Sequence, residues 1–172
     1  MSFYAFVELK NGDKVIVLKP DGHIFGKQYT SIISQYQLYY VEIETDDKAI
    51  QWFKKLEKLT EGHIKIIDNA TYIGDWEYSM DDYEKYIRDW GEDGDVTEEK
   101  FKEMLTEINN KWTPVEELIV SVEKMVQALP SLYTEEFFWF SPEDALPGFQ
   151  GLLNTLRRLH EEGNKKVRIQ IL

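Results

Sequence analysis

The chain has 172 residues, with 20 Lys and Arg against 32 Asp and Glu, a formal net charge of −12 and a hydrophobic content of 42%. This length and apolar content suffice to bury one core without covalent cross-links. There is no cysteine, which excludes disulfides, zinc–thiolate sites, iron–sulfur clusters and cysteine nucleophiles.

The first 70 residues predict a strand-rich part. Residues 3–10 and 14–19 are rich in aromatic and β-branched residues and flank Asn11-Gly12, a sequence that favours a tight hairpin turn. Residues 37–44 end in an alternation of apolar and acidic residues, which indicates a further strand.

A helix and another strand are expected next. Residues 46–60 carry apolar side chains at helical spacing, and Gly62 suits the left-handed exit from a helix. Residues 63–68 (HIKIID) then predict a strand. Together with residues 37–44 these segments predict one βαβ unit with a right-handed crossover. The apolar stripe of the helix is Ala49, Ile50, Phe53, Leu56 and Leu59.

Three helices are expected in the middle of the chain. The first covers residues 79–90 and the second begins after Thr97. The second helix carries Phe101, Met104, Leu105, Ile108 and Trp112 at helical spacing. The third opens with Thr113 as N-cap, Pro114 at the first helical position and Glu116 completing a capping box. Its apolar stripe is Val115, Leu118, Ile119, Val122, Val126 and Leu129.

The C-terminal part predicts a helix and a strand. The helix begins after Pro147 and ends at Gly163, and its apolar stripe is Phe149, Leu152, Leu153, Leu156 and Leu159. Residues 166–172 alternate between apolar residues and the polar Arg168 and Gln170. Such alternation is typical of a half-buried strand. We expect this strand to pair with the N-terminal sheet.

These elements predict an α+β fold. We expect a single domain over residues 1–172, with a mixed sheet of four to six strands and helices mainly on one side. The N-terminal hairpin, one βαβ unit and the C-terminal strand form the sheet. Residues 1–70 are the strand-rich part, 71–163 the helical part and 164–172 the closing strand.

The negative charge is concentrated in a central acidic segment, which we define as Asp75 to Glu107. It holds thirteen acidic and four basic residues, a net charge of −9. Carboxylates interleaved with aromatic residues suit the docking of a basic protein, because charge steers association and Trp and Tyr anchor interfaces. Alternatively, the aromatic residues belong to the core and the acids form a solvated face, a reading that helical spacing favours for Tyr83 and Trp90. The candidate partner-binding residues are Asp75, Trp76, Glu77, Asp81, Asp82, Tyr86, Asp89, Glu92, Asp93 and Asp95.

One stretch of this segment resembles a calcium-binding EF-hand loop. Asp89 and Asp93 match the first and fifth positions, and Gly94 matches the turn glycine. Gly91 offers no side-chain ligand at the third position, and Lys100 stands where the family has a bidentate glutamate. Turn formation and helix capping explain the same residues, so we assign no metal site.

Catalytic signatures are sparse. His23, His63 and His160 lack the spacing of a zinc site, and the chain contains no nucleophile elbow, phosphate-binding loop or dinucleotide fingerprint. Asp68 is a lone acid at the end of an apolar segment and a candidate for carboxylate chemistry, with a turn or cap role as the alternative. We assign no catalytic residue and no cofactor.

Four consecutive aromatic residues form a further candidate surface. Both faces of a strand with this sequence need to be covered, either by the core or by a partner or second copy. The residues are Phe137, Phe138, Trp139 and Phe140.

The excess of carboxylates opposes binding to nucleic-acid phosphates. No apolar run approaches the roughly 20 residues that a membrane-spanning helix needs, and the first residues do not have the pattern of a signal peptide. We therefore expect a cytoplasmic protein with neither nucleic acid nor membrane as partner.

Three functions remain open on this basis. The first is a small binding protein without catalytic activity that docks a basic protein, as a toxin-neutralising immunity protein does; the chain is similar to such proteins in size, acidity and aromatic content. The second is an enzyme with carboxylate acid/base chemistry in a cleft between sheet and helices. The third is a structural protein that self-associates through the aromatic residues 137–140.

Overall fold

The fold was determined as a computed structural model. It describes residues 5–12, 14–19, 47–72, 97–132 and 142–171.

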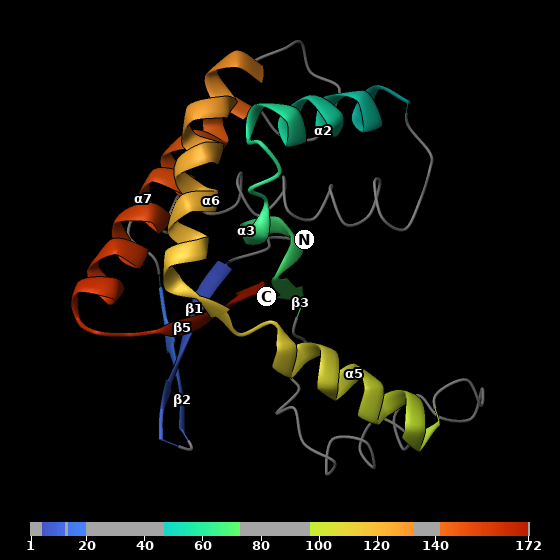
Figure 1. The fold of residues 1–172 in the computed structure, drawn as a ribbon, viewed down its shortest axis with the longest axis vertical. Helices are drawn as coiled ribbons and strands as arrows, with labels where there is room; N and C mark the ends of the chain where they lie inside the picture. Colours follow the sequence, from blue (N-terminus) through green and yellow to red (C-terminus); the bar gives the residue numbers. More distant parts are fainter. Residues whose placement is uncertain (1–4, 13, 20–46, 73–96, 133–141, 172) are drawn as a thin grey trace.

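A mixed sheet of five strands joins the two ends of the described chain (Figure 1). Strand β5 (Lys166–Ile171) is central: it pairs antiparallel with β1 (Ala5–Asn11) and β4 (Thr113–Pro114) and parallel with β3 (Ala70–Tyr72). Strand β2 (Lys14–Leu18) pairs antiparallel with β1, giving the order β2-β1-β5-β3. The predicted α+β fold with a mixed sheet, and the pairing of the last strand with the N-terminal hairpin, are confirmed.

The N-terminal hairpin turns at Asn11-Gly12, as the sequence predicted. Asn11 is the last residue of β1, and Gly12 adopts a φ of +63°. Glycine reaches this left-handed conformation without the steric cost that a Cβ atom imposes. The register then sets Glu8 opposite Val17 and Leu9 opposite Ile16.

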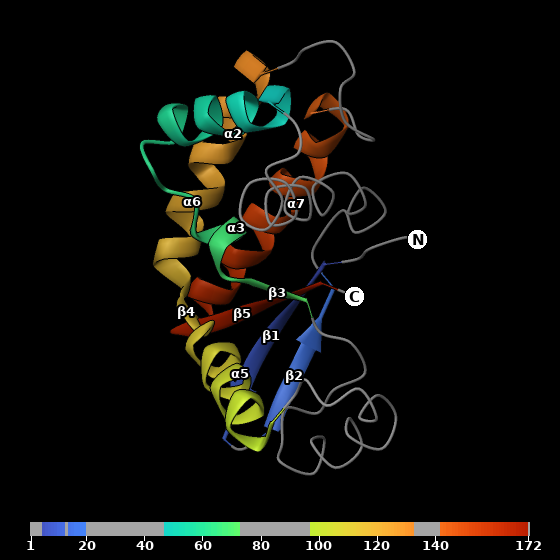
Figure 2. The same ribbon diagram turned by 90° about the vertical axis from the view of Figure 1, so that its right-hand side faces the viewer.

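Helices α6 (Val115–Ala128) and α7 (Pro142–Glu161) lie side by side over one face of the sheet, with α2 (Asp47–Leu59) across their far ends (Figures 1 and 2). A short 3₁₀ helix, η4 (Leu129–Leu132), continues α6. The apolar side chains of one sheet face meet the apolar stripes of these helices in one core. The core includes Val7, Leu9, Val167 and Ile169 from the sheet, Leu118, Val122 and Met125 from α6, and Phe149, Leu152 and Leu156 from α7.

Helix α2 confirms the helix expected over residues 46–60. Phe53 and Leu56 are fully buried, whereas Leu59, which the apolar stripe placed inside, is exposed. Trp52 is buried instead, and its indole N–H donates to the carbonyl of Leu132 at 3.2 Å. Gly62 has a φ of +76° and closes the helix by donating its N–H to the carbonyl of Glu57.

Residues 63–68 do not form the predicted strand. Residues Lys65–Asp68 form the short helix α3, and strand β3 begins only at Ala70. Ile66 and Ile67 are adjacent and both fully buried; in a strand they would face opposite sides of the sheet. A helical turn sends both into the core, and the N–H of Ile66 donates to the hydroxyl of Ser121 on α6 at 3.0 Å. The first strand of the predicted βαβ unit lies outside the described residues.

The predicted N-cap of α6 is also wrong. Thr113 belongs to β4, and its hydroxyl donates to the carbonyl of Lys111 and accepts from the side-chain amide of Asn69 at 2.6 Å. Pro114 occupies the cap position without a side-chain hydrogen bond. The N–H of Val115 donates to the carbonyl of Lys165, so pairing with β5, rather than a capping box, fixes the start of the helix.

Helix α5 (Glu98–Asn110) begins as predicted. The hydroxyl of Thr97 accepts a hydrogen bond from the N–H of Lys100 at 3.2 Å. Helix α7 confirms the buried stripe and the glycine exit at Gly163, with a φ of +88°, but it starts at Pro142 and contains Pro147.

Candidate functional site

The ten candidate partner-binding residues all lie in the segment 73–96, outside the described residues. So do the helix predicted over residues 79–90 and the EF-hand-like stretch up to residue 96. The four aromatic residues lie in the segment 133–141, also outside. The acidic surface and the aromatic surface therefore stay predictions. The acidic surface comprises Asp75, Trp76, Glu77, Asp81, Asp82, Tyr86, Asp89, Glu92, Asp93 and Asp95. The aromatic surface comprises Phe137, Phe138, Trp139 and Phe140.

Helix α5 is the described end of the central acidic segment. It extends away from α6 and α7 (Figure 1), and Phe101 is its fully buried anchor. Glu98 forms an ion pair with Lys102 at 2.9 Å, and this hydrogen bond raises the pKa of the Lys102 ammonium group. No ion pair among the described residues engages Glu103 or Glu107. All four glutamates of the helix are exposed to solvent: Glu98, Glu99, Glu103 and Glu107.

A second charged cluster lies on the face of the sheet opposite α6 and α7. Glu8 on β1 stands directly across from Arg168 on β5, and the two form an ion pair. Both are almost fully buried, with 3% and 2% exposure. The centroid of the Trp112 ring lies 4.7 Å from the guanidinium carbon of Arg168 and 4.7 Å from the ammonium nitrogen of Lys10. Charge, hydrogen bonding and aromatic contact together fix the Arg168 side chain.

This cluster links strand β1 to strand β5. The guanidinium of Arg168 donates a hydrogen bond from its Nε–H to the carboxylate of Glu8. Sequence reasoning missed the cluster because alternating polar residues in a strand usually face solvent. The pairing of Glu8 with Arg168 becomes evident only from the register of β1 against β5.

Gln170 lies two residues further along β5 and gives a direct test of this buried face. It is 8% exposed, and among the described residues its Oε1 atom has no hydrogen-bond partner. An unsatisfied buried acceptor costs about 1–3 kcal/mol, so Gln170→Met is expected to raise the free energy of unfolding by about 1 kcal/mol. Chemical denaturation measures the change, with Gln150→Met on the exposed side of α7 as the control. A clear loss of stability in Gln170→Met alone would show that the amide has a partner.

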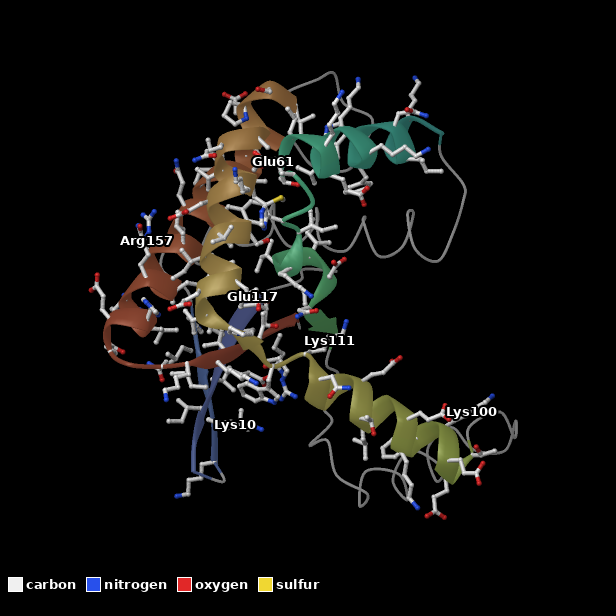
Figure 3. All side chains as sticks on the ribbon, in the orientation of Figure 1. Lys10, Glu61, Lys100, Lys111, Glu117 and Arg157 are labelled. Atoms are coloured by element: carbon white, nitrogen blue, oxygen red, sulfur yellow. The ribbon has the colours of Figure 1, made fainter. Side chains whose placement is uncertain are left out.

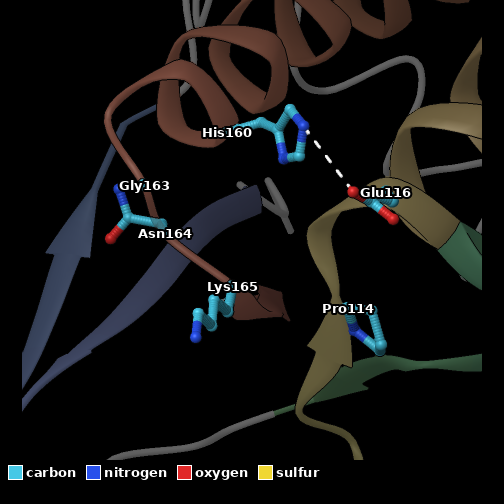
Figure 4. A pocket seen from close by; sticks show the side chains of 6 residues that line it. All are labelled: Pro114, Glu116, His160, Gly163, Asn164 and Lys165. Atoms are coloured by element: carbon cyan, nitrogen blue, oxygen red, sulfur yellow. Dashed lines mark ion pairs between the residues drawn. The ribbon is translucent and has the colours of Figure 1, made fainter.

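A surface hollow of about 440 Å³ lies where α6 begins and α7 ends (Figure 4). His160 points toward Glu116, with 3.7 Å between Nε2 and Oε1, and Lys165 lies nearby. Glu116 is in the first turn of α6 and His160 in the last turn of α7. An acid at a helix start and a base at a helix end both complement the helix dipoles, so the fold accounts for this pair without a ligand.

Asp68 does not end a strand but closes α3. Desolvation raises the pKa of its carboxyl group, while the neighbouring Lys65 and Lys111 lower it. Its backbone carbonyl accepts a hydrogen bond from the ammonium of Lys111 at 2.7 Å. Within the described ranges, no three His, Asp or Glu side chains gather as a metal site would need.

The ion pair between Glu61 and Lys124, at 3.0 Å, predicts a pH effect on stability. The hydrogen bond and charge of Lys124 lower the pKa of Glu61 below its ordinary 4.5. The folded state therefore gains stability from ionised Glu61 above pH 4.5, and loses it as the pH falls through the lowered value. Glu61→Gln is expected to be less stable than the wild type at neutral pH and equal to it in strong acid. Urea denaturation at several pH values checks this; a stability difference that is the same at every pH would contradict it.

The helices in the described part of the chain are all too short or too polar to cross a membrane. Comparison with protein-family models, curated proteins and solved structures finds no match to this chain.

Proposed function

We propose that the chain is a small binding protein without catalytic activity that docks a basic protein through its central acidic segment. The observation that supports this most is helix α5: its four glutamates are exposed along an element directed away from the core (Figure 1). A cationic partner approaching this helix meets carboxylates that the fold has not buried.

Electrostatics favours docking of such a partner at the central acidic segment over docking at the rest of the surface. The central acidic segment carries a net charge of −9 out of the −12 of the whole chain. Complementary charge raises the rate at which two proteins meet and suppresses wrong partners. A toxin-neutralising immunity protein in the cytoplasm is one instance of a protein that works in this way.

Co-purification of the tagged full chain from its native cells tests the proposal. A basic protein is expected to be recovered in stoichiometric amount at low salt and lost at high salt, because screening weakens exposed ion pairs. Recovery of no stable partner at low salt would contradict the proposal.

A charge-neutralised variant locates the contact. Changing the four glutamates of α5 to glutamine is expected to weaken binding at least about fourfold, because each exposed pair contributes about 0.2–1 kcal/mol. The matched control neutralises four exposed acids of the α7 region and changes the net charge by the same amount. Equal weakening by both variants would show that net charge, and not α5, matters. The control residues are Glu143, Asp144, Glu161 and Glu162.

A further inference from the structure

Strand β2 is an edge of the described sheet with apolar side chains open to solvent on both of its faces. Val15 and Val17 on one face are 47% and 49% exposed, and Ile16 on the other is 40% exposed. Its only pairing among the described strands is with β1. An exposed, β-branched edge of this kind is a template for pairing with another strand.

The register shows which backbone groups point outward. Asn11 pairs with Lys14 across a loop of two residues, and the pair that closes such a loop is hydrogen-bonded. Bonded and non-bonded pairs alternate along an antiparallel ladder. Lys14, Ile16 and Leu18 therefore direct their N–H and C=O groups toward β1, and Val15 and Val17 direct theirs away from it.

The edge is positively charged although the chain is acidic. Lys10, Lys14 and Lys19 are all exposed on the described hairpin. Glu8, the acidic residue of β1, is buried and neutralised by Arg168. A second copy of the chain would bring two such basic strands together, whereas an acidic strand would complement them.

We propose that β2 binds an extended acidic segment of another protein by β-augmentation. The backbone of the segment pairs with Val15 and Val17, its apolar residues cover the exposed side chains, and its carboxylates lie near Lys14 and Lys19. Main-chain hydrogen bonds supply affinity in this binding mode and side chains supply specificity. The site is separate from α5, since Lys10 and Lys100 lie far apart (Figure 3), and it does not depend on the proposed function.

Fluorescence anisotropy of the full chain with a labelled synthetic peptide, EVTVTVE, tests the proposal. Binding is expected at low salt, and the charge-inverted peptide KVTVTVK is expected to bind at least about tenfold more weakly. Val17→Pro removes one outward N–H at a position where a sheet edge tolerates proline, and it is expected to weaken binding about tenfold. The matched control Val17→Thr keeps the N–H and is expected to bind as the wild type does.

Three results would overturn the proposal. The first is equal binding of the two peptides, and the second is unchanged binding by a folded Val17→Pro variant, verified by circular dichroism. The third is a dimer of the free chain in sedimentation that Val17→Pro dissociates, which would assign the edge to a second copy. The variant with neutralised α5 is expected to bind the peptide normally, so failure here and failure of the proposed function remain distinguishable.

Discussion

Replacing Arg168 by methionine is expected to lower the free energy of unfolding by about 3–5 kcal/mol, the usual cost of breaking a buried ion pair. The substitution leaves the carboxylate of Glu8 almost fully buried without its partner. It also removes one of the two cations that, among the described residues, contact the ring of Trp112. Because Glu8 and Arg168 join β1 to β5, the loss falls on the pairing that connects the two ends of the described chain. Guanidinium denaturation measures it.

The double variant Glu8→Met with Arg168→Met separates charge burial from packing. Replacing both members of a buried pair by apolar residues is often neutral or stabilising, so the double variant is expected to recover most of the loss. Lys166→Met, on the same strand but exposed, is the control and is expected to stay within about 0.5 kcal/mol of the wild type. A double variant no more stable than Arg168→Met would refute the account of a charge stranded in the sheet.

Phe149→Ala is expected to destabilise the protein by about 3–5 kcal/mol, because truncating a core aromatic loses its burial and leaves a cavity. Phe149 is fully buried in the core cluster that joins α6, α7 and the sheet. The neighbouring Gln150 is exposed, so Gln150→Ala is expected to change stability by no more than about 0.5 kcal/mol. Thermal and urea unfolding of the two variants give the comparison; similar losses in both would contradict the placement of α7 on the sheet.

Local signals in the sequence predicted much of the fold. Turn chemistry located Gly12 and Gly62, and helical spacing located α2, α5, α6 and the buried stripe of α7. These features depend on neighbouring residues, so a single sequence suffices to find them. The predicted pairing of the first and last strands followed from the alternation at the end of the chain.

The errors arose where contacts distant in sequence decide the structure. Residues 63–68 have a strand-like composition but become helical because Ile66 and Ile67 both enter the core and Ser121 satisfies a backbone N–H. Thr113 has the sequence of an N-cap, yet it pairs with β5 and bonds to Asn69. Arg168 was expected on a polar face and is buried against Glu8, 160 residues away in the chain.

Less of the candidate site than of the fold could be predicted from the sequence. The cluster of carboxylates between Asp75 and Glu107 is visible in the sequence, but whether acids share one surface depends on tertiary packing. Exposure of the glutamates of α5 supports that surface at its described end. The exposed edge of β2 could not be predicted from the sequence. A hairpin strand that pairs on both sides and a hairpin strand left at the edge of a sheet have the same pattern of residues.

Amide hydrogen exchange of the full chain, free and bound to the basic partner recovered from its cells, tests the central claim most directly. The claim predicts slower exchange on binding across the central acidic segment, including α5 at residues 98–110, with no change in α7. Protection of α7 or of the hairpin, with α5 exchanging as in the free chain, would contradict it.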